Sequence, residues 1–194
     1  MTPVRTELIV GEEIFAPKSR RERARVVIGH GVNTHGVMGA GFAAQVSRRY
    51  PALLPDYRDA CRRGDLFPGR AWMVPVDAQG TLVANIASQC RPGKDARPDW
   101  LRQALRDAND ILATQHHQFE IRLPLIGAGI GGLAPTQAAD IIFECADEAP
   151  ENVSTHLYLL PEDPHTHAVS SRHAWWYRVD AAHGVQKHRW EGAV

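Results

Sequence analysis

The feature that most constrains this chain is a pair of glycine-rich segments, each lying between a short apolar run and a helical pattern. Residues 26–41 contain five glycines and residues 126–133 contain four. Glycine adopts positive φ and leaves no Cβ in the way of a ligand. A loop of this kind ahead of a helix directs free N–H groups and the positive end of the helix dipole toward one point, which suits a phosphate group.

The apolar pattern around these segments predicts an α/β fold. We expect strands at residues 7–10, 25–28, 71–76, 82–86, 120–126 and 155–160. We expect helices at residues 41–50, 55–63, 98–112 and 135–147. Because both glycine-rich segments follow strands, they can face each other across a crevice at the carboxyl ends of those strands, as a diphosphate requires.

Charge and composition exclude several classes of protein. Lys plus Arg and Asp plus Glu both number 22, so no net field draws the chain to nucleic acid or to a membrane. Arginines nevertheless crowd two segments, which are either a solvated helix surface or a rim that attracts an anionic substrate. They are Arg20, Arg21, Arg23 and Arg25 in the first segment and Arg48, Arg49, Arg58, Arg62, Arg63 and Arg70 in the second.

Targeting and metal signals are not apparent in the sequence. The three cysteines are far apart and form no C-x-x-C, so neither a disulfide framework nor a zinc ribbon is indicated. No stretch is long enough to span a membrane and the first residues contain no apolar signal core, so we expect a cytoplasmic protein without a cofactor or a bound metal.

The composition changes after Pro161. A short linker, Pro161–Pro164, is followed by histidines and aromatic residues, which are unlike the rest of the chain. They are His165, His167, His173, Trp175, Trp176, Tyr177 and Trp190. Large aromatic side chains rarely remain exposed. We therefore expect the extension to fold back on the domain or to form a homodimer contact.

Both glycine-rich segments resemble the two ADP-ribose loops of macrodomains. The likeness lies in Val32-Asn33 with residues 36–43 (GVMGAGFA) and in residues 124–133 (PLIGAGIGGL), and it is strongest to the branch that contains ADP-ribosyl glycohydrolases. It covers roughly residues 5–160. The resemblance implies a three-layer α/β/α macrodomain with a mixed central sheet over residues 1–160, and a separate extension over residues 161–194.

The resemblance also implies roles for individual residues. Glu12, with Glu13 as the alternative, would accept a hydrogen bond from the adenine amino group, and Asn33 would hold the distal ribose. Asn33 could equally shape its own turn. Met38 would pack against a sugar or serve as core filling. The expected phosphate loops are Gly39, Ala40 and Gly41, and Gly127, Ala128, Gly129, Ile130 and Gly131.

Two positions depart from the family pattern. Hydrolases of this branch commonly carry a lysine after the central strand and an aspartate in the second loop, where this chain has Gln89 and Gly131. Neither replacement titrates near neutral pH. His35 is the remaining candidate for general acid or base, with Asn33 and Gln89 orienting the ribose and a water molecule. His35 could instead be an ordinary surface histidine.

We therefore expect an enzyme that hydrolyses ADP-ribosyl linkages on protein, nucleic acid or a small metabolite. A non-catalytic ADP-ribose-binding module and an ADP-ribose 1''-phosphate phosphatase are the alternatives. A nicotinamide-dependent dehydrogenase is disfavoured, because Gly36, Gly39 and Gly41 do not have the G-x-G-x-x-G spacing.

Overall fold

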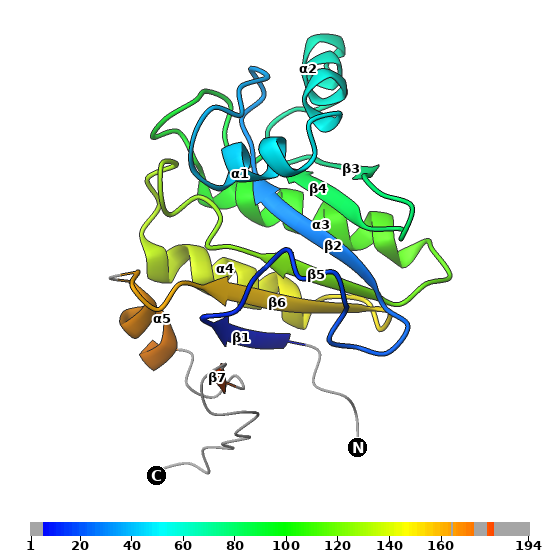
Figure 1. The fold of residues 1–194 in the computed structure, drawn as a ribbon. Helices are drawn as coiled ribbons and strands as arrows, with labels where there is room; N and C mark the ends of the chain where they lie inside the picture. Colours follow the sequence, from blue (N-terminus) through cyan, green and yellow to red (C-terminus); the bar gives the residue numbers. More distant parts are fainter. Residues whose placement is uncertain (1–5, 164, 173–177, 181–194) are drawn as a thin grey trace.

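The computed structural model describes residues 6–163, 165–172 and 178–180 (Figure 1). Its strands form one seven-stranded sheet in the order β3-β4-β2-β5-β6-β1-β7. The strands are β1 (Thr6–Val10), β2 (Arg25–Gly31), β3 (Ala71–Pro75), β4 (Leu82–Ile86), β5 (Phe119–Leu123), β6 (Val153–Leu159) and β7 (Arg178–Asp180). Among these strands only β3 runs antiparallel to its neighbour, so the predicted mixed sheet is confirmed.

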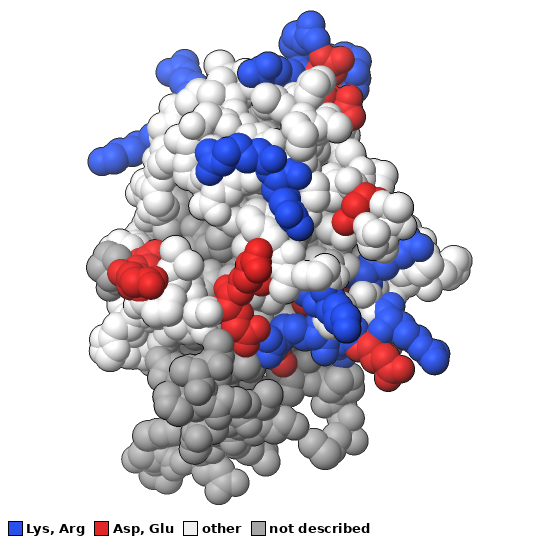
Figure 2. All heavy atoms as spheres, viewed as in Figure 1, with Lys and Arg blue, Asp and Glu red and all other residues white. Residues whose placement is uncertain are grey.

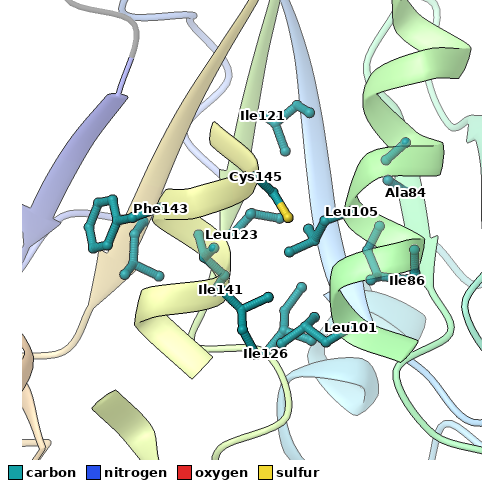
Figure 3. Close-up of a cluster of buried hydrophobic side chains, with 14 of the residues drawn as sticks. Ala84, Ile86, Leu101, Leu105, Ile121, Leu123, Ile126, Ile141, Phe143 and Cys145 are labelled. Atoms are coloured by element: carbon teal, nitrogen blue, oxygen red, sulfur yellow. The ribbon is translucent and has the colours of Figure 1, made fainter. Parts of the chain in front are cut away.

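Helices cover one face of the sheet as the apolar stripes predict. The helices α3 (Pro98–Ala113) and α4 (Pro135–Asp147) pack side by side on this face. Leu101 and Leu105 of α3 meet Ile141 and Cys145 of α4 over the side chains of β4 and β5 (Figure 3). Burial of these side chains is the main stabilising term for this layer.

The opposite face has a smaller core. There α1 (Gly41–Arg49) and α2 (Leu53–Arg63) bury Val46 and Tyr57 against Val26, Ile28 and Val83 of the sheet. Val26 and Ile28 face this core, whereas Val27 between them faces the core under α3 and α4. The sheet is therefore buried on both sides. The expected three-layer α/β/α architecture is confirmed.

Some element boundaries differ from the sequence predictions. The strand β5 ends at Leu123 rather than residue 126, because Pro124 cannot donate to a ladder and the chain turns there. The strand β2 continues to Gly31 because it pairs with β4 as far as Ile86. The helix α2 begins at Leu53, so Pro55 lies in its first turn, where proline is tolerated.

Part of the extension lies against the domain. The helix α5 (Thr166–Arg172) contacts α4 and buries Val169 completely, and β7 pairs with β1. The predicted fold-back of the aromatic residues and the homodimer contact concern His173, Trp175, Trp176, Tyr177 and Trp190, which lie outside the described residues. Within the described part of the chain, every helix is too short or too polar to cross a membrane.

Candidate functional site

The two glycine-rich loops meet at one edge of the sheet. The strands β2 and β5 are parallel neighbours, so residues 32–40 and residues 124–134 leave the sheet at the same edge. The loops come into contact, because a Cβ built on Gly41 would be 3.1 Å from Cδ1 of Ile130. The structure therefore places the two predicted phosphate loops on one shared site.

Backbone amides at this site lack partners in the described protein. The helix α1 begins after Ala40 with no side-chain cap and no acidic residue in its first turn, so its first N–H groups are free for a ligand. In the second loop, the amides of Gly129, Ile130 and Gly131 likewise donate to no described residue. Free amides on two opposed loops favour an anion between them.

Asn33 and Tyr57 fix the shape of the first loop. Asn33 Oδ1 accepts from the amides of His35 (3.0 Å) and Val37 (3.2 Å), and its Nδ2 donates to the Val37 carbonyl at 2.7 Å. Tyr57 Oη donates to the Asn33 carbonyl at 2.5 Å from α2, and burial raises the pKa of this tyrosine. The Asn33 amide thus shapes its own loop, and its contact with a ribose stays a prediction.

The loop after β4 supports the first loop. The Cys90 carbonyl accepts from the Thr34 amide at 3.0 Å and from Nδ1 of His35 at 2.8 Å. Gln89 directs its Nε2 to the Arg91 carbonyl at 2.8 Å. His35 therefore lies where the two loops meet, whereas Gln89 is bonded within its own loop. Only the side-chain oxygen of Gln89 has no partner among the described residues.

Asp95 stabilises the turn of the loop that follows β4. Its carboxylate accepts from the amides of Cys90 (3.0 Å) and Arg91 (2.7 Å), and the Arg91 amide lowers the pKa of this half-buried acid. A carboxylate engaged in this way stabilises the turn and is poorly placed to act as a base.

Met38 lies beneath the first loop rather than on its surface. It is 5% exposed and belongs to the core between the sheet and the helices α1 and α2. This position is that of core filling, and its packing against a sugar stays a prediction.

Gly131 has no space for a side chain. A Cβ there would be 2.7 Å from the Gly127 carbonyl oxygen and 2.8 Å from the Ala96 Cβ, both closer than real contacts allow. The Ala96 amide also donates to the Gly131 carbonyl at 3.1 Å. The aspartate that hydrolases of the resembled branch commonly carry at this position therefore does not fit the observed loop.

Introducing that aspartate tests this packing. We expect Gly131→Asp to lower the free energy of unfolding by about 1–3 kcal/mol, because the loop must move to accept the side chain. Gly129→Asp is the matched control, since a Cβ on Gly129 meets nothing within 4 Å. Urea denaturation of both variants measures the difference, and equal stabilities would show that the loop adapts freely.

A cavity of about 480 Å³ opens beside the two loops, on the side of β1 and β6. It is lined by the first residues after β1, by α1 and by the second loop, including Glu12, Glu13, Phe42 and Gly129. Phe15 stacks on Phe42 with ring centroids 5.3 Å apart and forms a flat apolar wall. Its size and its apolar lining are those of a small-molecule site.

The two acidic candidates in this cavity differ in their partners. Glu12 accepts from Nη1 of Arg20 at 2.5 Å, whereas the carboxylate of Glu13 is exposed and has no partner among the described residues. Both line the cavity, as the resemblance implies for an adenine contact. Glu13 is the acid that is free to accept from a base.

A buried charge network, which the sequence reasoning missed, holds this side of the cavity. Arg122 of β5 is fully buried and donates to the carbonyls of Ile14 (3.1 Å), Ala16 (2.5 Å) and Lys18 (2.6 Å). Its Nε also donates to Glu120 at 2.7 Å. This arginine therefore attaches the segment between β1 and β2 to the sheet.

The fold and the site define a class of protein: an α/β/α domain in which two glycine loops meet at one edge of the central sheet. The family model described as "Macro domain" matches residues 30–142, more than half of the chain. The chain belongs to this family, as the resemblance of its loops implies.

Individual relatives agree with this assignment. A DNA ADP-ribosyl glycohydrolase from Thermus aquaticus is 33% identical over 144 residues, which are 71% of this chain and 38% of the relative. The chain thus spans well under half the length of that protein. An ADP-ribose 1''-phosphate phosphatase from Lodderomyces elongisporus is 25% identical over 137 residues, 66% of this chain and 85% of the relative. The solved macrodomain of Thermus aquaticus DarG superposes with a TM-score of 0.67 and 28% identity, covering 79% of this chain and 97% of that one.

Proposed function

We propose that this chain binds ADP-ribose between its two glycine loops and hydrolyses an ADP-ribosyl linkage on protein, nucleic acid or a small metabolite. The observation that carries the proposal is the meeting of free amides from α1 and from Gly129–Gly131 beside a cavity of about 480 Å³. The amides suit the diphosphate, and the apolar wall with its free acid suits an adenosine. The names of the relatives point to the same ligand.

His35 is the proposed acid–base residue. The Cys90 carbonyl can only accept a hydrogen bond, so Nδ1 of His35 carries the proton, and Nε2 of the neutral ring is a proton acceptor. In hydrolysis, His35 would take a proton from a water molecule that attacks the anomeric carbon of the distal ribose. The group released from that carbon then leaves with the bonding electrons and takes up a proton.

Two other functions remain alternatives. A module that binds ADP-ribose without hydrolysis is favoured by the lack of space for an aspartate at Gly131 and by the amide at Gln89. Phosphatase action on ADP-ribose 1''-phosphate is favoured by the name of the Lodderomyces relative. In that reaction His35 would again be the acid–base residue.

Calorimetric titration with ADP-ribose, followed by turnover of carboxylate-, serine- and DNA-linked ADP-ribose, tests the proposal. We expect binding of ADP-ribose and turnover of at least one linkage. We expect His35→Ala to retain the affinity and to lose about 100-fold or more in turnover. His116→Ala, at an exposed position after α3, is the control. Binding without turnover would identify a binding module, and absence of binding would refute the proposal.

A further inference from the structure

The cavity of about 480 Å³ beside the two loops, which we call the adenosine cavity, is bounded partly by the turn that follows β6. Leu160, Asp163 and His165 line it together with Glu12, Glu13 and the second loop. Asp163 and His165 belong to the extension and lie beyond the residues whose sequence resembles a macrodomain. Part of the candidate site therefore comes from a segment to which the resemblance assigns no role.

Hydrogen bonds within this turn fix the position of Asp163. Its Oδ1 accepts from the His165 amide at 2.8 Å, and its carbonyl accepts from the Thr166 amide at 2.9 Å. Thr166 Oγ1 also donates to the Leu160 carbonyl at 2.6 Å, and Thr166 begins α5, which packs on α4. The second carboxylate oxygen of Asp163 has no partner among the described residues. One acceptor is thus free for a ligand and is held in place before the ligand binds.

The order of groups in ADP-ribose places the adenosine ribose near this turn. The proposed diphosphate site lies at Gly129 and the start of α1, and the expected adenine acceptors, Glu12 and Glu13, lie by the wall that Phe15 and Phe42 form. The ribose joins adenine to the diphosphate, so we place it between these two parts of the cavity. The turn after β6 is the wall that remains for it.

Tyr158 provides a polar group inside the cavity. It lines the cavity from β6 and is only 7% exposed, yet its hydroxyl has no hydrogen-bond partner among the described residues. Burial raises the pKa of Tyr158 to about 12, so the hydroxyl keeps its proton and can both donate and accept. A buried polar group is costly unless a ligand or a water molecule bonds to it. This part of the cavity therefore suits a ligand with hydroxyl groups better than a purely apolar one.

The charge around the cavity is acidic. Its carboxylates are Glu12, Glu13 and Asp163, and among them only Glu12 has an ion pair with a described residue, Arg20 at 2.5 Å. The described lining includes no lysine or arginine, and His165 contributes its one basic side chain. Figure 2 shows acidic side chains in two groups on this face, one over the segment that follows β1 and one over the turn that follows β6. A ligand group that adds negative charge between them is therefore disfavoured.

We propose that Asp163 makes the site specific for an adenosine whose ribose hydroxyls are free. Its unpaired oxygen accepts a hydrogen bond from a ribose hydroxyl, whereas it repels a phosphate at the same position. Carboxylates select a free ribose hydroxyl in this way in dinucleotide-binding sites, where an arginine instead accommodates a 2′-phosphate. The inference rests on the proposed function and adds the class of substrate: ADP-ribosyl groups without a phosphate on the adenosine ribose.

Affinities for ADP-ribose and ADP-ribose 2′-phosphate, measured by calorimetry with the whole chain, test this specificity. We expect the wild type to prefer ADP-ribose by about tenfold or more, because the additional phosphate lies beside the carboxylates. Asp163→Asn should bind the 2′-phosphate more tightly and lower the preference below about threefold. Asparagine retains an oxygen acceptor for the His165 amide, so the turn keeps its shape.

Glu162→Gln is the matched control for Asp163→Asn. It removes the same charge one residue earlier in the same turn, from an exposed residue that does not line the cavity. This variant should keep the wild-type preference. A preference that Asp163→Asn retains, that Glu162→Gln loses to the same extent, or that the wild type lacks would overturn the proposal.

Shorter ligands separate this specificity from the proposed function. Adenosine 5′-monophosphate and adenosine 2′,5′-bisphosphate contain the adenosine but neither the distal ribose nor a linkage to hydrolyse. We expect the wild type to prefer the monophosphate and Asp163→Asn to lose that preference.

The two ligand pairs together have distinct outcomes. If ADP-ribose fails to bind while the monophosphate is preferred, the proposed function is refuted and the specificity stands. If ADP-ribose binds and the members of each pair bind equally well, the specificity is refuted and the proposed function stands. Absence of binding for all four ligands would refute both.

Discussion

Gly39→Val is expected to weaken ADP-ribose binding by about 100-fold or more while the fold stays intact. A Cβ on Gly39 would meet nothing within 4 Å, and the residue does not require positive φ. Valine therefore fits the protein, but its methyl groups occupy the space in front of the free amides at the start of α1. Loss of two charge-assisted N–H contacts, at about 1.5–3 kcal/mol each, accounts for the expected change.

Calorimetry and thermal unfolding together measure this effect. We expect the Gly39→Val protein to unfold within about 2 °C of the wild type, since its core is unchanged. Ala78→Val is the control, because it adds two methyl groups to an exposed turn between β3 and β4. An undiminished affinity of Gly39→Val for ADP-ribose would show that the phosphates do not lie on this loop.

The layered fold follows from the sequence because its helices and strands are strongly periodic. Leu101, Leu105, Ala108 and Leu112 recur on one side of α3, and the structure buries all four. Both glycine loops follow strands, as the apolar pattern predicts. Local spacing is sufficient for these features, because each depends on residues that lie close together in the chain.

The buried network around β5 could not be found in this way. Glu120 and Arg122 alternate with Phe119, Ile121 and Leu123, a pattern typical of a strand with one face in water. In the structure both charged residues are fully buried under the segment that follows β1. Their partners lie about one hundred residues away in sequence, so only the tertiary structure identifies them.

The sequence predicts where the loops of the candidate site lie, but it does not predict which hydrogen bonds the side chains of the site form. The positions of the two loops required only glycine patterns. The engagement of Asn33 and Gln89 within their own loops depends on χ angles that the sequence does not reveal. Tyr57 was missed although it lies in the buried stripe of α2, because its hydroxyl meets the Asn33 carbonyl only after α2 packs on the first loop.

Arg122→Met is expected to lower the free energy of unfolding by about 3–5 kcal/mol at pH 7.5, because it leaves the Glu120 carboxylate buried without its cation. Burial alone would raise the pKa of Glu120, but His156 in its protonated form, Ser19 and Arg122 together hold it below its ordinary value. Burial also lowers the pKa of His156 to about 4, so this histidine is neutral at pH 7.5. At that pH Arg122 is therefore the charge that keeps Glu120 ionised.

The dependence on pH distinguishes this explanation from a simple loss of packing. In the wild type the folded pKa of Glu120 lies below the unfolded one, so its contribution to stability is present above the unfolded pKa and is lost as the pH falls. Without Arg122, we expect burial to outweigh the remaining hydrogen bonds from Ser19 and from the Arg20 and Arg21 amides, so that the folded pKa of Glu120 rises above the unfolded one. The folded variant then takes up a proton before the unfolded chain does, and its deficit relative to the wild type shrinks between pH 7.5 and pH 5.

Urea denaturation at both pH values measures this change. Arg106→Met is the control, since Arg106 pairs with Glu148 on the surface, and its loss should change stability little at either pH. A deficit for Arg122→Met that is equally large at pH 5 would attribute it to lost packing instead. Because Arg122 also holds the carbonyls of Ile14, Ala16 and Lys18, the variant should bind ADP-ribose less tightly under conditions where it remains folded. Weakened binding would therefore connect the buried charge pair to the wall of the adenosine cavity, where Ile14 lies 108 residues from Arg122 along the chain.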